Sequence, residues 1–253
     1  MAGLIGAVRT SRRGAAVGVW TLDEQVEYQR QGTWIGEADF GSVSLLLHMD
    51  GANASTTFTD SSSNALTVTA NGNAQISTAQ SKFGGASALF DGTTDYLTVA
   101  SSASFALFAG NFTVELWVRL NGTTNNQAVV QLSSSSTERA NISIVSNLIV
   151  LYTETGGNNA TRISGTAPST GTWHHVAWTR DGTTSRLFLN GTSVGTASSV
   201  PYPSGNMAVS IGANDRTSGG TCVDGYIDEL RITKGVARYT ANFTVPSNPF
   251  PNS

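Results

Sequence analysis

The acidic residues of this chain do not supply the carboxylate pair that hydrolysis of a glycosidic bond requires. A retaining glycosidase holds two carboxyl groups about 5 Å apart, one as acid and one as nucleophile. Glu115 is the only carboxylate of the alternating stretch Phe112–Leu120, and the neighbours Asp228 and Glu229 point to opposite faces of a strand. The sequence has no Gly-x-Ser-x-Gly elbow, phosphate loop or Cys-x-x-Cys motif. It therefore favours a protein that is not an enzyme.

The residues that could bind a sugar are one polar loop and two tyrosines. Aromatic rings stack on sugar rings, and carboxylate, amide and guanidinium groups form hydrogen bonds with hydroxyls. The loop Gly212–Asp224 carries Asp215 and Arg216 on a glycine-rich frame, and we expect Tyr152 and Tyr202 near other rims of the fold. The alternative is that the loop is a polar connection that needs its glycines to turn.

Histidine and cysteine do not form a predicted zinc site. His174 and His175 are neighbours in a predicted strand, so their side chains point to opposite faces. We expect both to be packing residues with satisfied hydrogen bonds, because they lie beside large aromatic residues. Cys222 is the only cysteine, so no disulfide can form within the chain.

Most of the chain consists of predicted short strands separated by Gly, Asn and Asp. Phe112–Leu120 alternates as a strand with one face in a core does, and Asn71-Gly72 predicts a hairpin turn between its flanking strands. No long helical pattern follows residue 40, so we predict an all-β antiparallel two-sheet sandwich. The other predicted strands are Ser44–Met49, Leu66–Ala70, Ala74–Thr78, Ala86–Phe90, Tyr96–Val99, Gln127–Leu132, Asn141–Val145, Leu148–Thr153, Met207–Ile211 and Tyr226–Thr233.

The stretch Gly171–Gly191 predicts the central hairpin. Trp173–Arg180 and Ser185–Leu189 are strand-like and flank the turn Asp181-Gly182. Large rings occur at both faces of the first strand, so we expect it to be covered on both sides. The predicted core residues are Leu116, Trp117, Trp173, Trp178, Leu189 and Ile232.

Residues 1–40 differ from the sandwich and form a predicted arm. A short helix is expected near Leu22–Gln31, with Thr21 as its cap and Glu24 completing a capping box. One short helix is not stable alone, so its apolar residues must pack on the sandwich or on a neighbouring subunit. We predict an anchoring arm, with a disordered tail as the alternative. The predicted partner-binding residues are Arg12, Arg13, Trp20, Leu22, Val26 and Trp34.

Charge and hydropathy exclude two classes of partner. The net charge of −3 gives no sign of nucleic-acid binding. The longest apolar run, Val43–Met49, is too short to span a membrane, and residues 1–18 lack the apolar core of a signal peptide. We therefore expect neither nucleic acid nor a membrane as a partner.

Four stretches together resemble the laminin-G-like, concanavalin-A-like jelly-roll domains. They are Gly171–Gly191 (with WHHVA, RDG and LFLNG), Leu45–Gly51, Lys82–Val99 and Gly225–Thr233 followed by KGVARY. The resemblance covers roughly residues 43–251 and implies a jelly roll over residues 41–253, with an early hairpin at Lys82–Val99. No cofactor is predicted. The resemblance makes calcium, held by oxygen ligands, the candidate metal, with Asp50 and Asp228 as its candidate ligands. The alternatives are that Asp50 begins a turn and that Asp228 caps backbone amides.

Similar chains with a short N-terminal arm occur in structural proteins of tailed bacteriophages. We therefore predict a non-enzymatic virion protein, a capsid decoration or a tail-fibre component, anchored to other virion proteins through residues 1–40 and homo-oligomeric in the particle. The alternative is a carbohydrate-binding adhesion module that recognises host cell-surface glycans. A hydrolase ranks third because the paired carboxylates are missing.

Overall fold

The structure is a computed structural model that describes residues 37, 39–123, 126–214 and 221–252. Within these residues the regular secondary structure consists of β-strands and two short 3-10 helices, η1 at Phe40–Ser42 and η2 at Ala103–Phe105. The helix predicted near Leu22–Gln31 lies outside the described residues. In the described ranges no helix has the length and hydropathy of a membrane span. Residues 37–253 form one compact unit.

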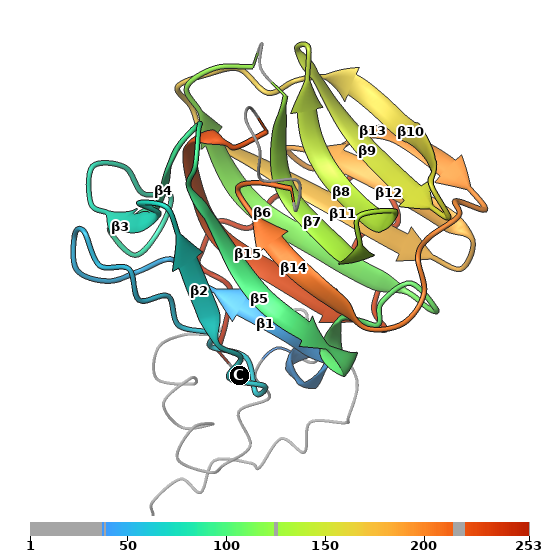
Figure 1. The fold of residues 1–253 in the computed structure, drawn as a ribbon, viewed down its shortest axis with the longest axis horizontal. Helices are drawn as coiled ribbons and strands as arrows, with labels where there is room; N and C mark the ends of the chain where they lie inside the picture. The colour runs from blue at the N-terminus through green and yellow to red at the C-terminus, as the bar shows by residue number, and fades with distance from the viewer. Residues whose placement is uncertain (1–36, 38, 124–125, 215–220, 253) are drawn as a thin grey trace, which may run out of the picture. The chain divides into compact units, whose positions relative to one another are not determined.

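The strands form two antiparallel sheets, which confirms the predicted sandwich (Figure 1). Their bounds are β1 Val43–Leu47, β2 Val68–Asn71, β3 Gln75–Ser77, β4 Ser87–Asp91, β5 Tyr96–Ser102, β6 Phe112–Leu120, β7 Gln127–Ser135, β8 Glu138–Val145, β9 Leu148–Thr155, β10 Asn158–Thr166, β11 His174–Asp181, β12 Thr184–Leu189, β13 Thr192–Ser198, β14 Met207–Ile211 and β15 Asp224–Lys234. The eight-stranded sheet has the order β13-β12-β11-β6-β15-β4-β3, with β1 paired to β15. The seven-stranded sheet has the order β10-β9-β8-β7-β14-β5-β2.

The central strand β11 is covered on both sides, as predicted. It pairs with β6 and β12. Val176 and Trp178 belong to the core cluster, and His175 is fully buried on the opposite face. Four of the predicted core residues are buried, namely Leu116, Trp117, Trp178 and Ile232. Trp173 and Leu189 are only partly buried, because Trp173 precedes β11 and Leu189 is the last residue of β12.

The hairpin predicted at Asn71-Gly72 is wrong. β2 pairs with β5 in the seven-stranded sheet, whereas β3 pairs with β4 in the eight-stranded sheet. The turn therefore carries the chain from one sheet to the other, since turn residues fix a local reversal and not the pairing partner. Gly72 has φ +66°, and a Cβ there would lie 2.5 Å from the Thr94 carbonyl oxygen. The early hairpin expected within Lys82–Val99 is wrong for the same reason, because β4 and β5 also lie in different sheets.

Two strands, β10 and β13, were not predicted. Each is the last strand of its sheet, and each is rich in Asn, Gly, Ser and Thr. An edge strand has one free side and needs no continuous apolar face, so its sequence lacks the periodic signal of a central strand.

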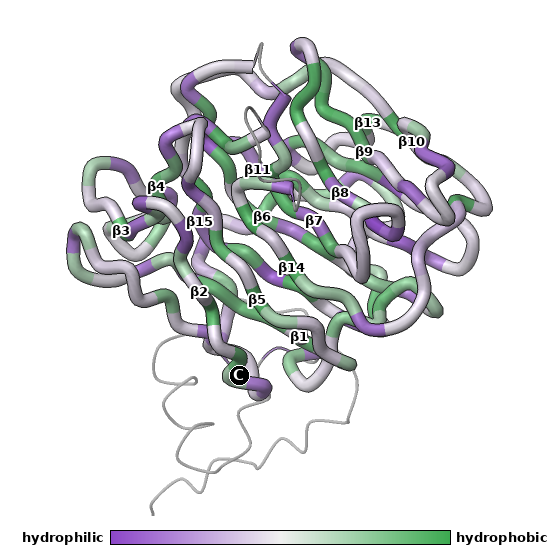
Figure 2. The backbone as a smooth tube through the Cα atoms, viewed as in Figure 1, coloured by the Kyte–Doolittle hydropathy of each residue, from purple (hydrophilic) through white to green (hydrophobic). Residues whose placement is uncertain are grey.

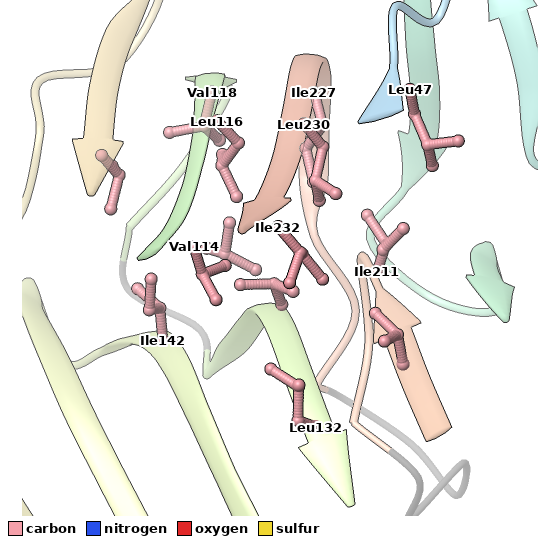
Figure 3. Packing of buried hydrophobic residues seen from close by; sticks show 14 of the residues in the cluster. Leu47, Val114, Leu116, Val118, Leu132, Ile142, Ile211, Ile227, Leu230 and Ile232 are labelled. Atoms are coloured by element: carbon pink, nitrogen blue, oxygen red, sulfur yellow. The ribbon is translucent and has the colours of Figure 1, made fainter. Parts of the chain in front are cut away.

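The core lies between the two sheets. Val114, Leu116 and Val118 of β6 and Ile227, Leu230 and Ile232 of β15 face Leu132, Ile142 and Ile211 of the other sheet (Figure 3). Each of these residues is fully or almost fully buried. The strands also carry hydrophilic residues, which are mixed with the hydrophobic ones along the chain (Figure 2). Alternation places these on the outer faces of the sheets, where the two sheets differ.

A C-terminal tail, residues 236–252, covers the outer face of the eight-stranded sheet. Thr113 Oγ1 donates to the Val236 carbonyl at 2.9 Å, and Thr179 Oγ1 donates to the Tyr239 carbonyl at 2.8 Å. The Phe243 amide bonds to the Gly191 carbonyl. Gly191 must be glycine here, because a Cβ would lie 2.0 Å from the Phe243 carbonyl oxygen. The tail makes this face part of the interior.

Candidate functional site

A row of polar side chains crosses the outer face of the seven-stranded sheet. The pairing register places its members opposite one another on successive strands: Thr69, Thr98, Ser210, Gln131, Asn141, Tyr152 and Thr161. Their strand neighbours, among them Leu132, Ile142 and Leu151, belong to the core. Since side chains alternate between faces, the row points away from the core.

The row borders a hollow of about 290 Å³ over β7, β8 and β9. Its lining combines uncharged polar residues with the aliphatic Ala128, Val145 and Val150 and with one charged residue, Arg139. The lining residues are Asn126, Gln127, Ala128, Arg139, Asn141, Ser143, Val145, Val150, Tyr152, Thr161, Asn214 and Thr221. A concave site with several convergent polar groups is the usual form of a small-molecule binding site.

Two amides in the centre of the row are bonded to each other and retain further capacity. Asn141 Nδ2 donates to Gln131 Oε1 at 3.3 Å, and Ser143 Oγ donates to Asn141 Oδ1 at 3.0 Å. Gln131 and Asn141 are 0% and 5% exposed. Among the described residues, Gln131 Nε2 and the Ser210 hydroxyl have no hydrogen-bond partner. Buried polar groups are normally paired, so these two atoms retain hydrogen-bonding capacity that the described residues do not use.

An ion pair orients the single aromatic residue of the hollow. Arg139 Nη2 donates to Glu154 Oε2 at 2.5 Å, and the Tyr152 hydroxyl donates to the same oxygen at 3.2 Å. The Arg139 guanidinium carbon lies 5.6 Å from the centre of the Tyr152 ring. The guanidinium and the carboxylate therefore fix both the ring and the hydroxyl of Tyr152.

The four residues predicted to bind sugar are separated by the fold. Tyr152 lines the hollow. Tyr202 packs within the protein: its ring stacks on Phe108 at 4.7 Å, and its hydroxyl accepts from Trp178 Nε1 at 3.1 Å. Asp215 and Arg216 lie outside the described residues. The residues that flank this segment, Asn214 and Thr221, both line the hollow.

The proposed calcium ligands do not form a described metal cluster. Asp228 Oδ2 accepts the backbone amides of Lys82 at 2.7 Å and Phe83 at 3.1 Å, which is the alternative role predicted for it. Burial, with added repulsion from Glu229 and Asp50, raises the pKa of Asp228 to about 7. Asp50 is exposed. The described ranges contain no group of three acidic, His or Cys residues that could hold a metal ion.

Both neighbouring histidines have a hydrogen-bond partner, but His175 is only partly satisfied, because its buried Nδ1 has none among the described residues. His174 Nδ1 lies 2.8 Å from Asn190 Nδ2, and His175 Nε2 lies 3.2 Å from Glu115 Oε2. The predicted partner-binding residues Arg12, Arg13, Trp20, Leu22, Val26 and Trp34 lie outside the described residues. Nothing in the described structure bears on them.

Sequence analysis missed the amide centre of the site. The strand containing Asn141 was predicted, but no role was assigned to its polar positions. The available signal was the alternation of Asn141, Ile142, Ser143 and Ile144, which places amide and hydroxyl groups on one face. That Gln131 lies beside Asn141 depends on the pairing of β7 with β8.

Comparison with protein families gives one match. The profile of the family Laminin_G_3, described as the concanavalin A-like lectin/glucanases superfamily, matches residues 91–238. A search of curated protein sequences returned no match.

Solved structures share the fold at low sequence identity. Domain 4 of AbnA, an extracellular arabinanase from Geobacillus stearothermophilus solved with arabinotriose, is 18% identical with a TM-score of 0.60, and the match covers 78% of this chain and 94% of that one. The botulinum neurotoxin serotype C1 binding domain is 15% identical with a TM-score of 0.60, and the match covers 78% of this chain and 50% of that one. A structure of botulinum neurotoxin type C, whose cell entry depends on interaction with two ganglioside molecules, is 15% identical with a TM-score of 0.60. That match covers 79% of this chain and 49% of the neurotoxin chain.

These likenesses concern the fold. The chain spans about half the length of the neurotoxin chains that it matches. The family profile, by contrast, covers more than half of this chain, and it includes the central strands that carry the laminin-G-like motifs. The chain belongs to the concanavalin A-like lectin/glucanase superfamily.

Proposed function

We propose that this protein is a non-enzymatic carbohydrate-binding module whose site is the hollow over β7, β8 and β9. The observation that carries the proposal is the central amide pair. Gln131 and Asn141 are buried in the outer face of a sheet, and Gln131 Nε2 has no partner among the described residues. Amides both donate and accept, so they suit hydroxyl groups, which do the same.

The remaining chemistry of the hollow also fits a neutral sugar. The hydroxyls of Ser143 and Thr161 extend the polar surface on both sides of the amide pair. Tyr152 supplies an aromatic ring with a polar tip. Two structural neighbours support carbohydrate as the ligand class: the arabinanase domain was solved with arabinotriose, and botulinum neurotoxin type C interacts with gangliosides.

The charges near the hollow support binding without hydrolysis. No aspartate or glutamate occurs among the described lining residues. The carboxylate of Glu154 is paired with Arg139, and it accepts a hydrogen bond from the Tyr152 hydroxyl. A glycosidase would need two carboxylates at a defined separation.

A glycan array with matched tyrosine variants tests this site. Tyr152→Ala and Asn141→Ala should each lower the affinity for any bound glycan by at least about tenfold, since each removes a direct contact. Tyr226→Ala is the control, because Tyr226 is a half-buried tyrosine on the other sheet with the Arg119 guanidinium 5.7 Å from its ring. Equal losses in the Tyr152 and Tyr226 variants, or no binding by the intact protein to neutral or host cell-wall glycans, would refute the proposal.

We further propose that the module is carried on a phage virion and is anchored there by residues 1–40. The support is the composition of this arm, which holds two tryptophans and a capped amphipathic segment but too little apolar material to fold alone. The expected partners are other virion proteins and further copies of this chain. Capsid decoration and tail-fibre attachment remain the two placements.

Deletion of residues 2–36 tests the anchor. This truncation keeps Glu37, which belongs to the compact unit that starts there. We expect the truncated protein to retain the thermal stability and glycan binding of the sandwich and to lose incorporation into particles. Incorporation at the level of the intact chain would show that the arm is not the anchor.

A further inference from the structure

Two arginines share one carboxylate beneath the tail of the eight-stranded sheet. Arg231 of β15 donates through Nη1 to Glu37 Oε2 at 2.6 Å, and Arg238 of the tail pairs through Nη1 with Glu37 Oε1. Arg231 turns its other edge to Glu115, with Nε and Nη2 at 2.9 and 2.7 Å from Oε1. Arg238 Nε donates to Thr233 Oγ1 at 2.9 Å. Glu37 therefore bridges a sheet strand and the tail.

The bridge lies largely out of water. The side chains of Arg231, Arg238 and Glu37 are 6%, 10% and 13% exposed. The Phe250 ring lies 4.0 Å from the Arg231 guanidinium and covers it from the tail. Burial lowers the pKa of Arg238 to about 10, because poorly solvated surroundings disfavour its charge.

The charge balance of this cluster depends on Glu37. Glu37 and Glu115 offset the two guanidiniums of Arg231 and Arg238. Glu115 also has other partners: its Oε2 accepts a hydrogen bond from the Tyr239 hydroxyl at 2.8 Å and lies 3.2 Å from His175 Nε2. Without Glu37, two buried cations would share one carboxylate.

We propose that Arg231 and Arg238 form a carboxylate-binding site that the chain fills with its own Glu37. This internal ligand ties Glu37 to β15 and holds the tail over the sheet. The two arginines belong to the sandwich and lie far along the chain from Glu37, so the sandwich without Glu37 is electrostatically incomplete.

Chemical rescue of the full-length Glu37→Ala variant tests the site. The variant should lose about 10 °C in Tm, because removal of one partner leaves a buried charge uncompensated. Sodium acetate, a free carboxylate that fits the space left by the side chain, should restore part of that loss in a saturable way. Sodium chloride at equal ionic strength is the control for screening, and Asp39→Ala is the control for loss of a nearby carboxylate.

A second measurement keeps the test valid if Glu37→Ala folds poorly. In Glu37→Gln, which retains shape without charge, amide hydrogen exchange should rise about tenfold or more in residues 236–250 and stay unchanged in β7, β8 and β9. A Glu37→Ala variant that melts with the intact protein would overturn the proposal. So would equal effects of acetate and chloride, or unchanged exchange in the tail.

Discussion

The two outer faces of the sandwich carry polar side chains through the same alternation, but the tail covers one face and the other carries an open hollow. On the seven-stranded sheet, Asn141 lines an open hollow, and its neighbour Gln131 has an amide nitrogen with no partner among the described residues. On the eight-stranded sheet, Glu115 lies under the tail. Its carboxylate accepts hydrogen bonds from Arg231 and from the Tyr239 hydroxyl, and His175 Nε2 lies within hydrogen-bond distance of it. A covered polar group depends on partners within the protein, and His175 Nδ1 and Trp117 Nε1 have none among the described residues. A polar group that borders a hollow can be satisfied by a ligand or by water.

This difference assigns stability to one face and binding to the other. Substitutions beneath the tail should change the free energy of unfolding and leave ligand binding intact in the folded fraction. Substitutions in the hollow should do the reverse. Four measurements test this division.

The largest expected effect is that of Glu115→Ala. Removing this fully buried carboxylate leaves Arg231 with only part of its compensation, so the free energy of unfolding should fall by about 4 kcal/mol. Urea denaturation measures the loss, and Glu115→Gln separates charge from shape. A loss below about 1 kcal/mol would mean that the covered face is not the stabilising one.

Phe250→Ala should cost about 3 kcal/mol. Phe250 is 4% exposed and packs with Val43 and Leu46 of β1, so its removal leaves a cavity under the tail. The matched control is Leu148→Ala, because Leu148 is a large apolar residue that is 43% exposed. Thermal unfolding of both variants compares them, and similar Tm values would contradict a tail that is packed as part of the core.

The His48–Glu229 pair should add about 2 kcal/mol of stability at acidic to neutral pH. The hydrogen bond with Glu229 Oε1, at 2.8 Å, raises the pKa of His48 from 6.5 to about 8. Because the folded pKa is raised above the unfolded value, this stability is fully present below pH 6.5 and is lost as the pH rises through 8. Denaturation at a series of pH values should show this slope in the intact protein, and His48→Gln should flatten it. An unchanged slope would assign the pH dependence to other groups.

The smallest effect on stability is expected for Gln131→Leu. The substitution removes an amide whose nitrogen is unpartnered, but it also removes the acceptor of Asn141 Nδ2, so the free energy of unfolding should fall by about 1 kcal/mol. Glycan affinity should nevertheless fall by about tenfold or more. A large loss of stability would show that the amide belongs to the fold and not to the site.

Much of the fold could be predicted because the central strands carry their own signal. Phe112–Leu120 alternates over its whole length, and the structure gives β6 the same bounds. Met207–Ile211 was also predicted with the bounds of β14. The turn at Asn71-Gly72 was placed correctly, but its neighbours pair across different sheets, since a local reversal does not choose a partner.

Of the candidate site, the sequence predicted Tyr152 and not its amide neighbours. Tyr152 is recognisable by residue type alone, whereas Gln131 becomes a site residue only because β7 pairs with β8. Tyr202, of the same residue type, is stacked on Phe108 instead. Residue type indicates what a side chain could do, and its surroundings decide whether it does so.

The sequence by itself determined the all-β class, the central hairpin and the laminin-G-like motifs, because these depend on alternation and turn residues within short stretches. Only the tertiary structure decided which outer face is covered and which is open. That choice rests on contacts between distant segments: the tail lies on β6 and β11, and Glu37 reaches Arg231 and Arg238. Such contacts leave no periodic trace in the sequence, since each depends on the position of the partner segment and not on the local pattern.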